Sequence, residues 1–417
     1  MGILLAHPTT GHSPYSANVL HGAGLLQLYV TSFHYRSGGR IEKFVHMMPE
    51  KAATTLHRKL LRRRRAAIPE YLIKELPLIE LANRLYLKFA NRPDRHWGFR
   101  TFDRFVSGVL SSDYSGYYGY LTSSLYSMRR AKALGLPRFL TMPICHWDLG
   151  RRLMHDEYAR WGMEREYEEP YPWVADRFDV EMTEELDLAN VIVAGSEFVV
   201  DSLVQNGISE NKVLLNPSGV DLSLYTQKDA RSGFHFDRRH RRQRPFRIIS
   251  VGKLGLRKGT LDLLAAAQQL GSSVEVRLLG GNDLPQRLQK QYWGGNIEHV
   301  GHLPYLEVPS MLRWADAFVF PTIFEGSSLA SYEALAAGLP VITTPNCGSV
   351  VRDGIDGWLI PIRSPDAICS AVTRLMEDED MWLRMSNSAS QRAREFTWER
   401  YGETLVSALT PHLALES

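Results

Sequence analysis

Short apolar runs alternate with amphipathic stretches along the C-terminal half of the chain. The runs are typical of strands buried on both faces, and the stretches between them have helical spacing. Strands are predicted at 246–251, 274–279, 297–300, 317–320, 341–343 and 358–360, and helices at 260–270, 285–292, 308–314 and 329–337. Because continuous apolar strands alternate with helices, we expect a parallel, doubly wound α/β domain.

The N-terminal half repeats this alternation with a weaker pattern. Strands are predicted at 3–6, 29–33, within 136–143, at 190–194 and at 212–215, and helices at 15–28, 149–169 and 174–188. Residues 50–90 are interpreted as an inserted helical hairpin. The polar, basic stretch at 225–245 lacks periodicity and has the composition of a linker. We therefore expect one domain over 1–225 and a second over 245–395.

Composition narrows the class of protein. A chain of 417 residues suits two domains, and a net charge of +3 is too small to indicate a nucleic-acid partner. The three cysteines, Cys145, Cys347 and Cys369, have no metal-like spacing and favour a reducing compartment. The chain shows neither a signal peptide nor an apolar run long enough to span a bilayer. We expect a cytoplasmic protein, at most peripheral on a membrane.

The segment SVGKLGLRKGT at 250–260 carries the first candidate chemistry. A strand leads into a tight turn at Gly252, followed by Lys253, Arg257 and Lys258 and then by a helix. Backbone amides at a helix start, together with cationic side chains, form an anion site that suits a diphosphate. The alternative is a basic surface loop between a strand and a helix.

The segment PTIFEGSSLASYEALAAGLPVITT at 321–344 carries the second. Glu325 follows a strand, and Glu333 lies on the next helix, whose start Ser327 or Ser328 can cap. Carboxylates at such positions accept hydrogen bonds from the paired hydroxyls of a sugar or ribose. The alternative for Glu333 is an acidic residue that complements the helix dipole.

In this order and about 70 residues apart, these segments resemble the donor-binding half of the retaining glycosyltransferases of family four, which have the GT-B fold. That fold has two Rossmann-like domains facing across a cleft. The segments 216–221 and 353–359 also resemble family motifs, and 396–401 resembles the start of a last helix (396–417) that crosses back to the first domain. The resemblance is strong over 190–400 and weak over 1–145.

The resemblance assigns roles to individual residues. It implies that Lys253 and Lys258, with Gly252 and Arg257 in the same loop, hold the donor diphosphate. Glu325 touches the transferred sugar, and Glu333 binds the ribose hydroxyls. The sugar and phosphate are also lined by the backbone at Gly326, Ser327, Ser328 and Leu329. Two departures are Lys253, where the family more often has Arg, and Ser328, where many members have Gly.

Candidate active-site residues of the N-terminal domain are less distinct. His146 follows an apolar strand and resembles the family's active-site histidine; the alternative is a histidine held in a helix-start network with Trp147 and Asp148. Gly11 is the candidate for the glycine that lies near the acceptor and diphosphate, and His12 beside it is a weaker candidate for the histidine.

Three further segments are weighed against simpler explanations. The basic run 57–65 could contact an anionic membrane or an anionic acceptor, or be a solvated helix face. The tyrosines of 114–120 could stack on a saccharide or belong to a flexible loop. The acidic triplet Asp378, Glu379 and Asp380 fits an Asp-x-Asp metal motif formally, but a solvated helix face explains it better. We expect no metal site and no cofactor.

The sequence thus predicts a retaining, metal-independent hexosyltransferase that uses a UDP- or GDP-sugar and an unidentified saccharide or lipid-linked acceptor. Cationic side chains would stabilise the leaving diphosphate. The alternatives are a nucleotide-sugar epimerase of the same shape and a non-catalytic scaffold that retains the donor site. A dehydrogenase is disfavoured because no G-x-G-x-x-G follows a predicted strand.

Overall fold

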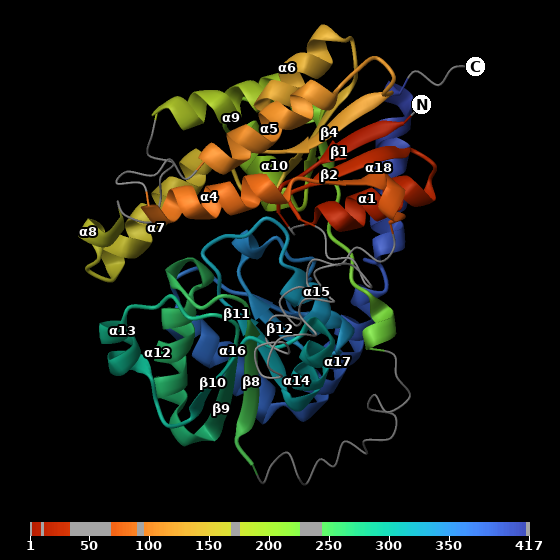
Figure 1. Cartoon of the computed structure of the whole chain (residues 1–417). Coiled ribbons are helices and arrows are strands. Elements are labelled where there is room, and N and C mark those ends of the chain that lie inside the picture. The colour runs from red at the N-terminus through yellow and green to blue at the C-terminus, as the bar shows by residue number, and fades with distance from the viewer. Residues whose placement is uncertain are drawn as a thin grey trace, which may run out of the picture.

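The computed structural model describes residues 2–9, 12–33, 68–89, 96–167, 176–225 and 244–413. These residues form two parallel sheets, one in each half of the molecule (Figure 1). The first has the order β3-β2-β1-β4-β5-β6-β7, with β1 Ile3–Ala6, β2 Leu26–Thr31, β3 Ile73–Glu75, β4 Gly116–Tyr120, β5 Arg138–Met142, β6 Val191–Ala194 and β7 Val213–Leu215. The second has the order β10-β9-β8-β11-β12-β13, with β8 Phe246–Val251, β9 Val274–Leu279, β10 Ile297–Gly301, β11 Ala317–Phe320, β12 Val341–Thr343 and β13 Gly357–Leu359. The predicted α/β architecture of two Rossmann-like halves is confirmed.

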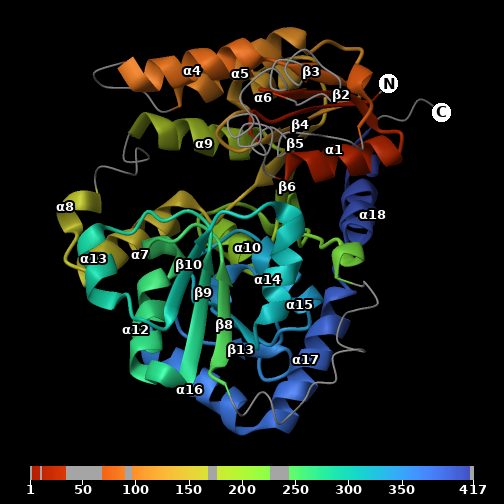
Figure 2. The same cartoon turned by 60° about the horizontal axis from the view of Figure 1, so that its bottom comes forward.

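Helices cover both faces of each sheet (Figures 1 and 2). In the first half they are α1 Ser13–Gly22, α4 Pro77–Phe89, α5 Trp97–Val109, α6 Leu125–Ala133, α7 Trp147–Arg160, α8 Glu164–Tyr167, α9 Asp176–Leu188 and α10 Glu197–Val204. In the second they are α12 Thr260–Leu270, α13 Gln286–Tyr292, α14 Val308–Trp314, α15 Leu329–Ala336, α16 Pro365–Glu377 and α17 Glu379–Ala393. The helix α18 Trp398–Leu409 follows in sequence but packs on the first half.

The buried strands explain why both faces need cover. Successive side chains of a strand point to opposite faces. In β1, Leu4 packs in a cluster with residues of α5, α6 and α9. Its neighbours Ile3 and Leu5 pack on the other face, with residues of α1 and α18. Each apolar strand therefore supplies two separate hydrophobic layers.

The last described helix, α18, packs against α1 in the first half of the molecule. In Figure 1 it lies beside α1, although the two are at opposite ends of the sequence. Leu405 and Leu409 are fully buried there. The hydroxyl of Tyr401 lies 2.8 Å from that of Ser16, which gives the apolar contact a fixed register.

The helix α7 follows β5 of the first sheet but packs into the core of the second half. Met154 belongs to the same buried cluster as residues of α12 and α16. At the edge of this contact, Arg160 donates to Asp262 over 2.6 Å, and Arg363 donates to Glu157 over 2.8 Å. Because both carboxylates are buried, an arginine partner for each is needed to limit the cost of burying charge.

Besides the helix predicted at 149–169, which is divided into α7 and α8, two sequence predictions in the N-terminal half are wrong. The helix predicted at 15–28 ends at Gly22, and β2 begins at Leu26. Gly24 has φ +71°, a left-handed conformation that reverses the chain between them. Apolar residues continue through this turn, and the helical pattern therefore hid the boundary.

The second error concerns the strands β3 and β4. The segment 114–120 contains β4, a strand next to β1, and Tyr117 and Tyr118 are fully buried instead of lying in a loop. Of the hairpin predicted at 50–90, residues 50–67 lie outside the described residues; the remainder contains the strand β3 as well as α4. Buried tyrosines and a three-residue strand leave little periodic signal.

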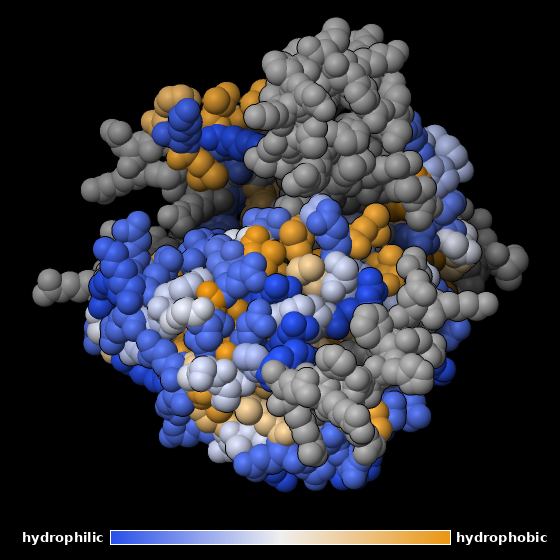
Figure 3. Space-filling view, turned by 90° about the horizontal axis from the view of Figure 1, so that it is seen from below, coloured by the Kyte–Doolittle hydropathy of each residue, from blue (hydrophilic) through white to orange (hydrophobic). Residues whose placement is uncertain are grey.

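The surface is largely hydrophilic on the face shown in Figure 3, with apolar residues in small groups. On α4, the spacing of the exposed residues Leu78, Leu81 and Leu85 places them along one side of the helix. No helix in the described part of the chain is long and apolar enough to cross a membrane.

The turn before α12 gives a test of this packing. Gly259 has φ +63°, and a Cβ there would lie 1.9 Å from the carbonyl oxygen of Pro321. Gly259→Ala should lower the free energy of unfolding by about 2–4 kcal/mol, from left-handed strain plus overpacking. Gly207→Ala is the control, because Gly207 has φ +87° and open space around it. It should cost only the strain, about 1–2 kcal/mol. If urea denaturation shows that both variants lose the same free energy of unfolding, the close contact at Gly259 is refuted.

Candidate functional site

Both segments with candidate chemistry lie at the point where the order of strands in the second sheet reverses. The strands β8 and β11 are neighbours in the sheet but not in sequence. In parallel sheets, ligands bind outside the carboxyl ends of strands at such a switch point. Residues 252–259 follow β8, and residues 321–328 follow β11. The topology therefore brings the two segments together.

Two cations and one carboxylate join these loops. A guanidinium nitrogen of Arg257 lies 2.5 Å from Oε1 of Glu325, and the Nζ of Lys258 pairs with the same oxygen. The backbone reinforces the contact, since the amide of Ile323 donates to the carbonyl of Arg257 over 2.8 Å. Burial lowers the pKa of Lys258, and Glu325 opposes this shift only in part.

The other predicted cation lies apart from this cluster. Lys253 pairs with Asp283, and its side chain is 64% exposed. The loop itself is tightly packed at Gly252, because a Cβ on the facing Gly280 would lie 2.0 Å from the Gly252 carbonyl oxygen. In this structure, therefore, Lys253 and Lys258 are held by different carboxylates.

Glu333 lies on α15 in an environment that disfavours its charge. Burial raises the pKa of Glu333 to about 7, and a hydrogen bond from Tyr305 lowers it only in part. A carboxylate in this setting has acceptor capacity that ligand hydroxyls could use.

The loop before α15 also touches the first half of the molecule. A Cβ on Gly326 would lie 1.9 Å from the carbonyl oxygen of Pro143, so only glycine fits there. The carbonyl of Gly326 accepts from the hydroxyl of Ser196 over 2.6 Å. Next to it, Ser327 accepts from the amide of Ser218 over 3.3 Å. Ser328 occupies the N-cap position of α15 before Leu329, but its side chain makes no capping bond.

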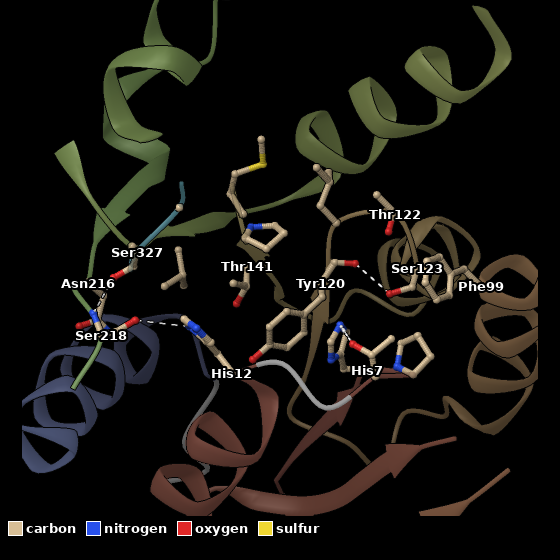
Figure 4. A pocket seen from close by; sticks show the side chains of 18 of the residues that line it. His7, His12, Phe99, Tyr120, Thr122, Ser123, Thr141, Asn216, Ser218 and Ser327 are labelled. Atoms are coloured by element: carbon tan, nitrogen blue, oxygen red, sulfur yellow. Dashed lines mark hydrogen bonds between the residues drawn. The ribbon is translucent and has the colours of Figure 1, made fainter. Parts of the chain in front are cut away.

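A cavity of about 380 Å³ lies between the two halves. It is lined by the carboxyl ends of β1, β4, β5, β6 and β7, together with Gly326 and Ser327. Figure 4 shows Ser218 and Ser327 near one end and Phe99 and Ser123 near the other, with Tyr120 between them. Its lining combines hydroxyl groups with aromatic rings.

The two candidate histidines occupy different places. His12 lines the cavity, and its Nδ1 lies 3.4 Å from the hydroxyl of Ser218 (Figure 4). His146 is not among the lining residues; it is the N-cap of α7, where its ring accepts from the amide of Asp148 and stacks on Trp147. Burial lowers the pKa of both rings to about 4. In the structure, His146 therefore belongs to a network at the start of α7 with Trp147 and Asp148. Gly11 lies outside the described residues.

Sequence reasoning missed most of the cavity lining. The residues share one property, a position at or just beyond the end of a strand in the first sheet: His7, Tyr120, Thr141, Gly195 and Asn216. The strand-end rule would have identified those that follow β6 and β7, whose strands were predicted. Tyr120 belongs to the tyrosines of 114–120 that could stack on a saccharide, but its place at a strand end was missed because β4 was not recognised.

The remaining candidates add no metal site. Asp378 caps α17 by accepting from the amide of Met381 over 2.8 Å. Within the described residues, no three or more His, Cys, Asp or Glu side chains are grouped so as to hold a metal ion. The basic run 57–65 lies outside them.

Sequence comparison matches residues 245–378 to the family model Glycosyl transferases group 1. A similar curated protein is the amylovoran biosynthesis glycosyltransferase AmsK of Erwinia amylovora, 29% identical over 42% of this chain and 45% of its own length. Another is the glycogen synthase of Mycobacterium tuberculosis, 27% identical over 48% of this chain and 51% of its own length. The chain thus spans about half the length of the curated relatives it matches.

Solved structures with the same fold cover nearly the whole chain. Anabaena HepE in complex with UDP has a TM-score of 0.64 at 13% identity, and covers 99% of this chain and 100% of its own. Sucrose-phosphate synthase of Thermosynechococcus elongatus has a TM-score of 0.63 at 17% identity, covering 99% and 98%. At these identities the likeness establishes the fold.

The raised pKa of Glu333 predicts a pH-dependent stability. Between its unfolded value of 4.5 and about 7, the folded state binds more protons than the unfolded state. The contribution of Glu333 to stability therefore falls as the pH rises through this window. Glu333→Gln should raise the free energy of unfolding by on the order of 1–3 kcal/mol at pH 8 and leave it unchanged at pH 4.5. Urea denaturation at both pH values checks this, with the exposed Glu403→Gln as control. A gain that is equal at both pH values would contradict the assignment.

Proposed function

We propose that this chain, whose residues 245–378 form a domain of the glycosyl transferases group 1 family, transfers a hexose from a nucleoside-diphosphate sugar to a saccharide or lipid-linked acceptor. The observation that carries the proposal is the convergence of Arg257 and Lys258 on Glu325 at the switch point of the second sheet. Partly buried cations at this position suit an anionic ligand, and the carboxylate suits hydroxyl groups.

The donor diphosphate would lie against Lys258 and Arg257, with Lys253 joining after it leaves Asp283. Negative charge grows on the leaving diphosphate as the glycosidic bond breaks. Fixed cations in a site shielded from water stabilise that charge more than bulk solvent does. The HepE structures are complexes with UDP and with UDP-glucose, which supports a uridine nucleotide as the first donor to test.

The sugar end of the donor would meet Glu325 and the backbone from Gly326 to Leu329. Glu333, with its spare acceptor capacity, would accept hydrogen bonds from the two ribose hydroxyls. The cavity beside Gly326 and Ser327 would hold the acceptor, because it lies next to the expected sugar position and is lined by the other half of the molecule. We expect retention of the anomeric configuration because the chain resembles family four.

Nucleotide binding tests the donor half of the proposal. Calorimetry with UDP, GDP, ADP and CMP should reveal one preferred base. The preferred nucleotide at 100 times its Kd should stabilise the chain by about 2.7 kcal/mol. Lys258→Ala should lose about 2.7–4 kcal/mol of transition-state stabilisation, a 10²–10³-fold fall in kcat. Lys290→Ala is the control, since Lys290 is exposed on α13.

The alternatives give different outcomes in the same experiment. Nucleotide binding without sugar transfer to any acceptor would favour a scaffold. Conversion of the sugar nucleotide without an acceptor would indicate an epimerase. An anomer of inverted configuration in the NMR spectrum of the product would refute the retaining mechanism. A failure of all four nucleotides to bind would refute the donor site itself.

Metal independence is a separate part of the proposal. Because Arg257 and Lys258 already supply positive charge to the expected diphosphate position, a divalent ion is not needed there. Transfer activity should stay within about twofold after treatment with EDTA. A change of this size corresponds to much less than the roughly 1.4 kcal/mol of barrier height that a tenfold loss of rate would require. A loss of activity that is reversed by adding Mg²⁺ or Mn²⁺ would refute metal independence.

A cytoplasmic location and membrane contact through 57–65 stay predictions from the sequence.

A further inference from the structure

The turn between β4 and α6, residues 121–124, has an unusual backbone. Thr122 has φ +81°, a left-handed conformation that is rare for a β-branched residue. Among the described residues, Arg363 is the other non-glycine with positive φ. Strain of this kind persists only where surrounding contacts enforce it, and it concentrates at functional sites.

A buried carboxylate enforces the strained turn. Glu185 on α9 is 2% exposed, and its two oxygens accept from the amides of Thr122 over 2.6 Å and Ser124 over 2.9 Å. The hydroxyl of Ser124 is turned back to the strand, where it bonds the amide and carbonyl of Tyr120. Ser124 therefore does not cap α6 with its own side chain.

A second buried carboxylate supports the same helix start. Asp103 on α5 accepts from the amide of Tyr126 over 2.6 Å and the amide of Ser127 over 3.1 Å. Burial raises the pKa of Glu185 to about 8 and that of Asp103 to about 7, so both carboxyl groups are costly to keep charged. A glycine at 122 and a simple serine cap would form this turn at lower cost.

The strained turn lies at the edge of the cavity. Leu121, Thr122 and Ser123 all line it, and Figure 4 shows Thr122 and Ser123 on the same side as Phe99. Within the described residues, no hydrogen bond involves the hydroxyl of Thr122. An aromatic ring beside an available hydroxyl group suits a sugar, which presents an apolar C–H face and polar edges.

We propose that the turn 121–124 recognises the acceptor saccharide, with the Thr122 hydroxyl bonding a sugar hydroxyl and Glu185 acting as the positioning residue that holds the turn. This rests on the proposed function. The strain and the buried carboxylate fix the backbone that carries this hydroxyl, so that the residue is held at the cavity edge before the saccharide binds.

Substitutions at Thr122 distinguish an effect on glycoside binding from an effect on the stability of the fold. The probes are the methyl glycosides of glucose, galactose and mannose, titrated by saturation-transfer NMR in the presence of the preferred nucleotide. Thr122→Gly removes the hydroxyl and relieves the strain, so Tm should rise while the Kd of the bound glycoside rises at least fivefold. Thr122→Ser keeps the hydroxyl and should bind within twofold of wild type. A Thr122→Gly variant that gains stability and binds the glycoside as wild type does overturns the proposal.

Glu185→Gln tests the positioning role. In Gln, an NH₂ group replaces one of the two carboxylate oxygens. Because this group donates and cannot accept from a backbone N–H, one of the two bonds to the turn is lost. The Kd of the glycoside should rise while the Kd of the nucleotide stays unchanged. A lower Tm with both affinities unchanged would mean that Glu185 serves the fold alone.

Nucleotide binding in the same samples distinguishes the two proposals. If the nucleotide binds to wild type and none of the glycosides does, the turn does not recognise a saccharide, and the donor site stands. If Lys258→Ala abolishes nucleotide binding but the glycoside still binds in the absence of nucleotide, the cavity acts independently of the donor site. If the glycoside binds and no nucleotide does, the proposed transfer fails while recognition by the turn stands.

Discussion

The contact on which the site depends is the close approach of Gly326 to the chain that follows β5. The carbonyl of Pro143 occupies the space that a side chain at 326 would need, and the hydroxyl of Ser196 holds the carbonyl of Gly326. The carboxyl ends of the two sheets meet at this point. The candidate donor loops of one half and the cavity of the other are adjacent because a backbone without a side chain passes between them.

The helix α7 makes this approach a broad interface. It leaves the first sheet directly after Pro143 and His146, and it then packs into the hydrophobic core of the second half. The capping bond at His146 fixes where the helix begins, and Arg160 and Arg363 fix its far end. The burial of His146 is therefore explained by its place at the start of α7, while its role as a catalytic residue stays a prediction from the sequence.

The sequence was most informative in segments where the residues of the proposed donor site also form the turns and helix starts of the fold. The segments 250–260 and 321–344 were identified because a strand, a glycine turn and a helix start leave a clear local pattern, and the charges fall within it. The partners of those charges were not predictable. That Lys253 pairs with Asp283 while Lys258 pairs with Glu325 depends on the side-chain packing of loops distant in sequence.

The cavity was harder to predict because its lining comes from many elements, each contributing one or two polar residues. A pattern confined to neighbouring residues cannot reveal such a set. The strand β4 illustrates the difficulty, since its tyrosines are buried by contacts such as the bond between Tyr118 and Thr141, on the neighbouring strand β5. The left-handed Thr122 is harder still, because nothing in the local sequence indicates a conformation that Glu185 imposes from α9.

Glu325 links the charge balance of the free chain to the proposed transfer. Without a ligand, Arg257 and Lys258 are partly buried cations, and both pair with Glu325, which balances one of their two positive charges. A diphosphate brings at least two negative charges and can replace the carboxylate as their partner. In the proposed transfer, the freed carboxylate would then accept hydrogen bonds from the hydroxyls of the sugar that arrives with the diphosphate. The same exchange keeps the cations paired at every stage, which avoids the cost of an isolated buried charge.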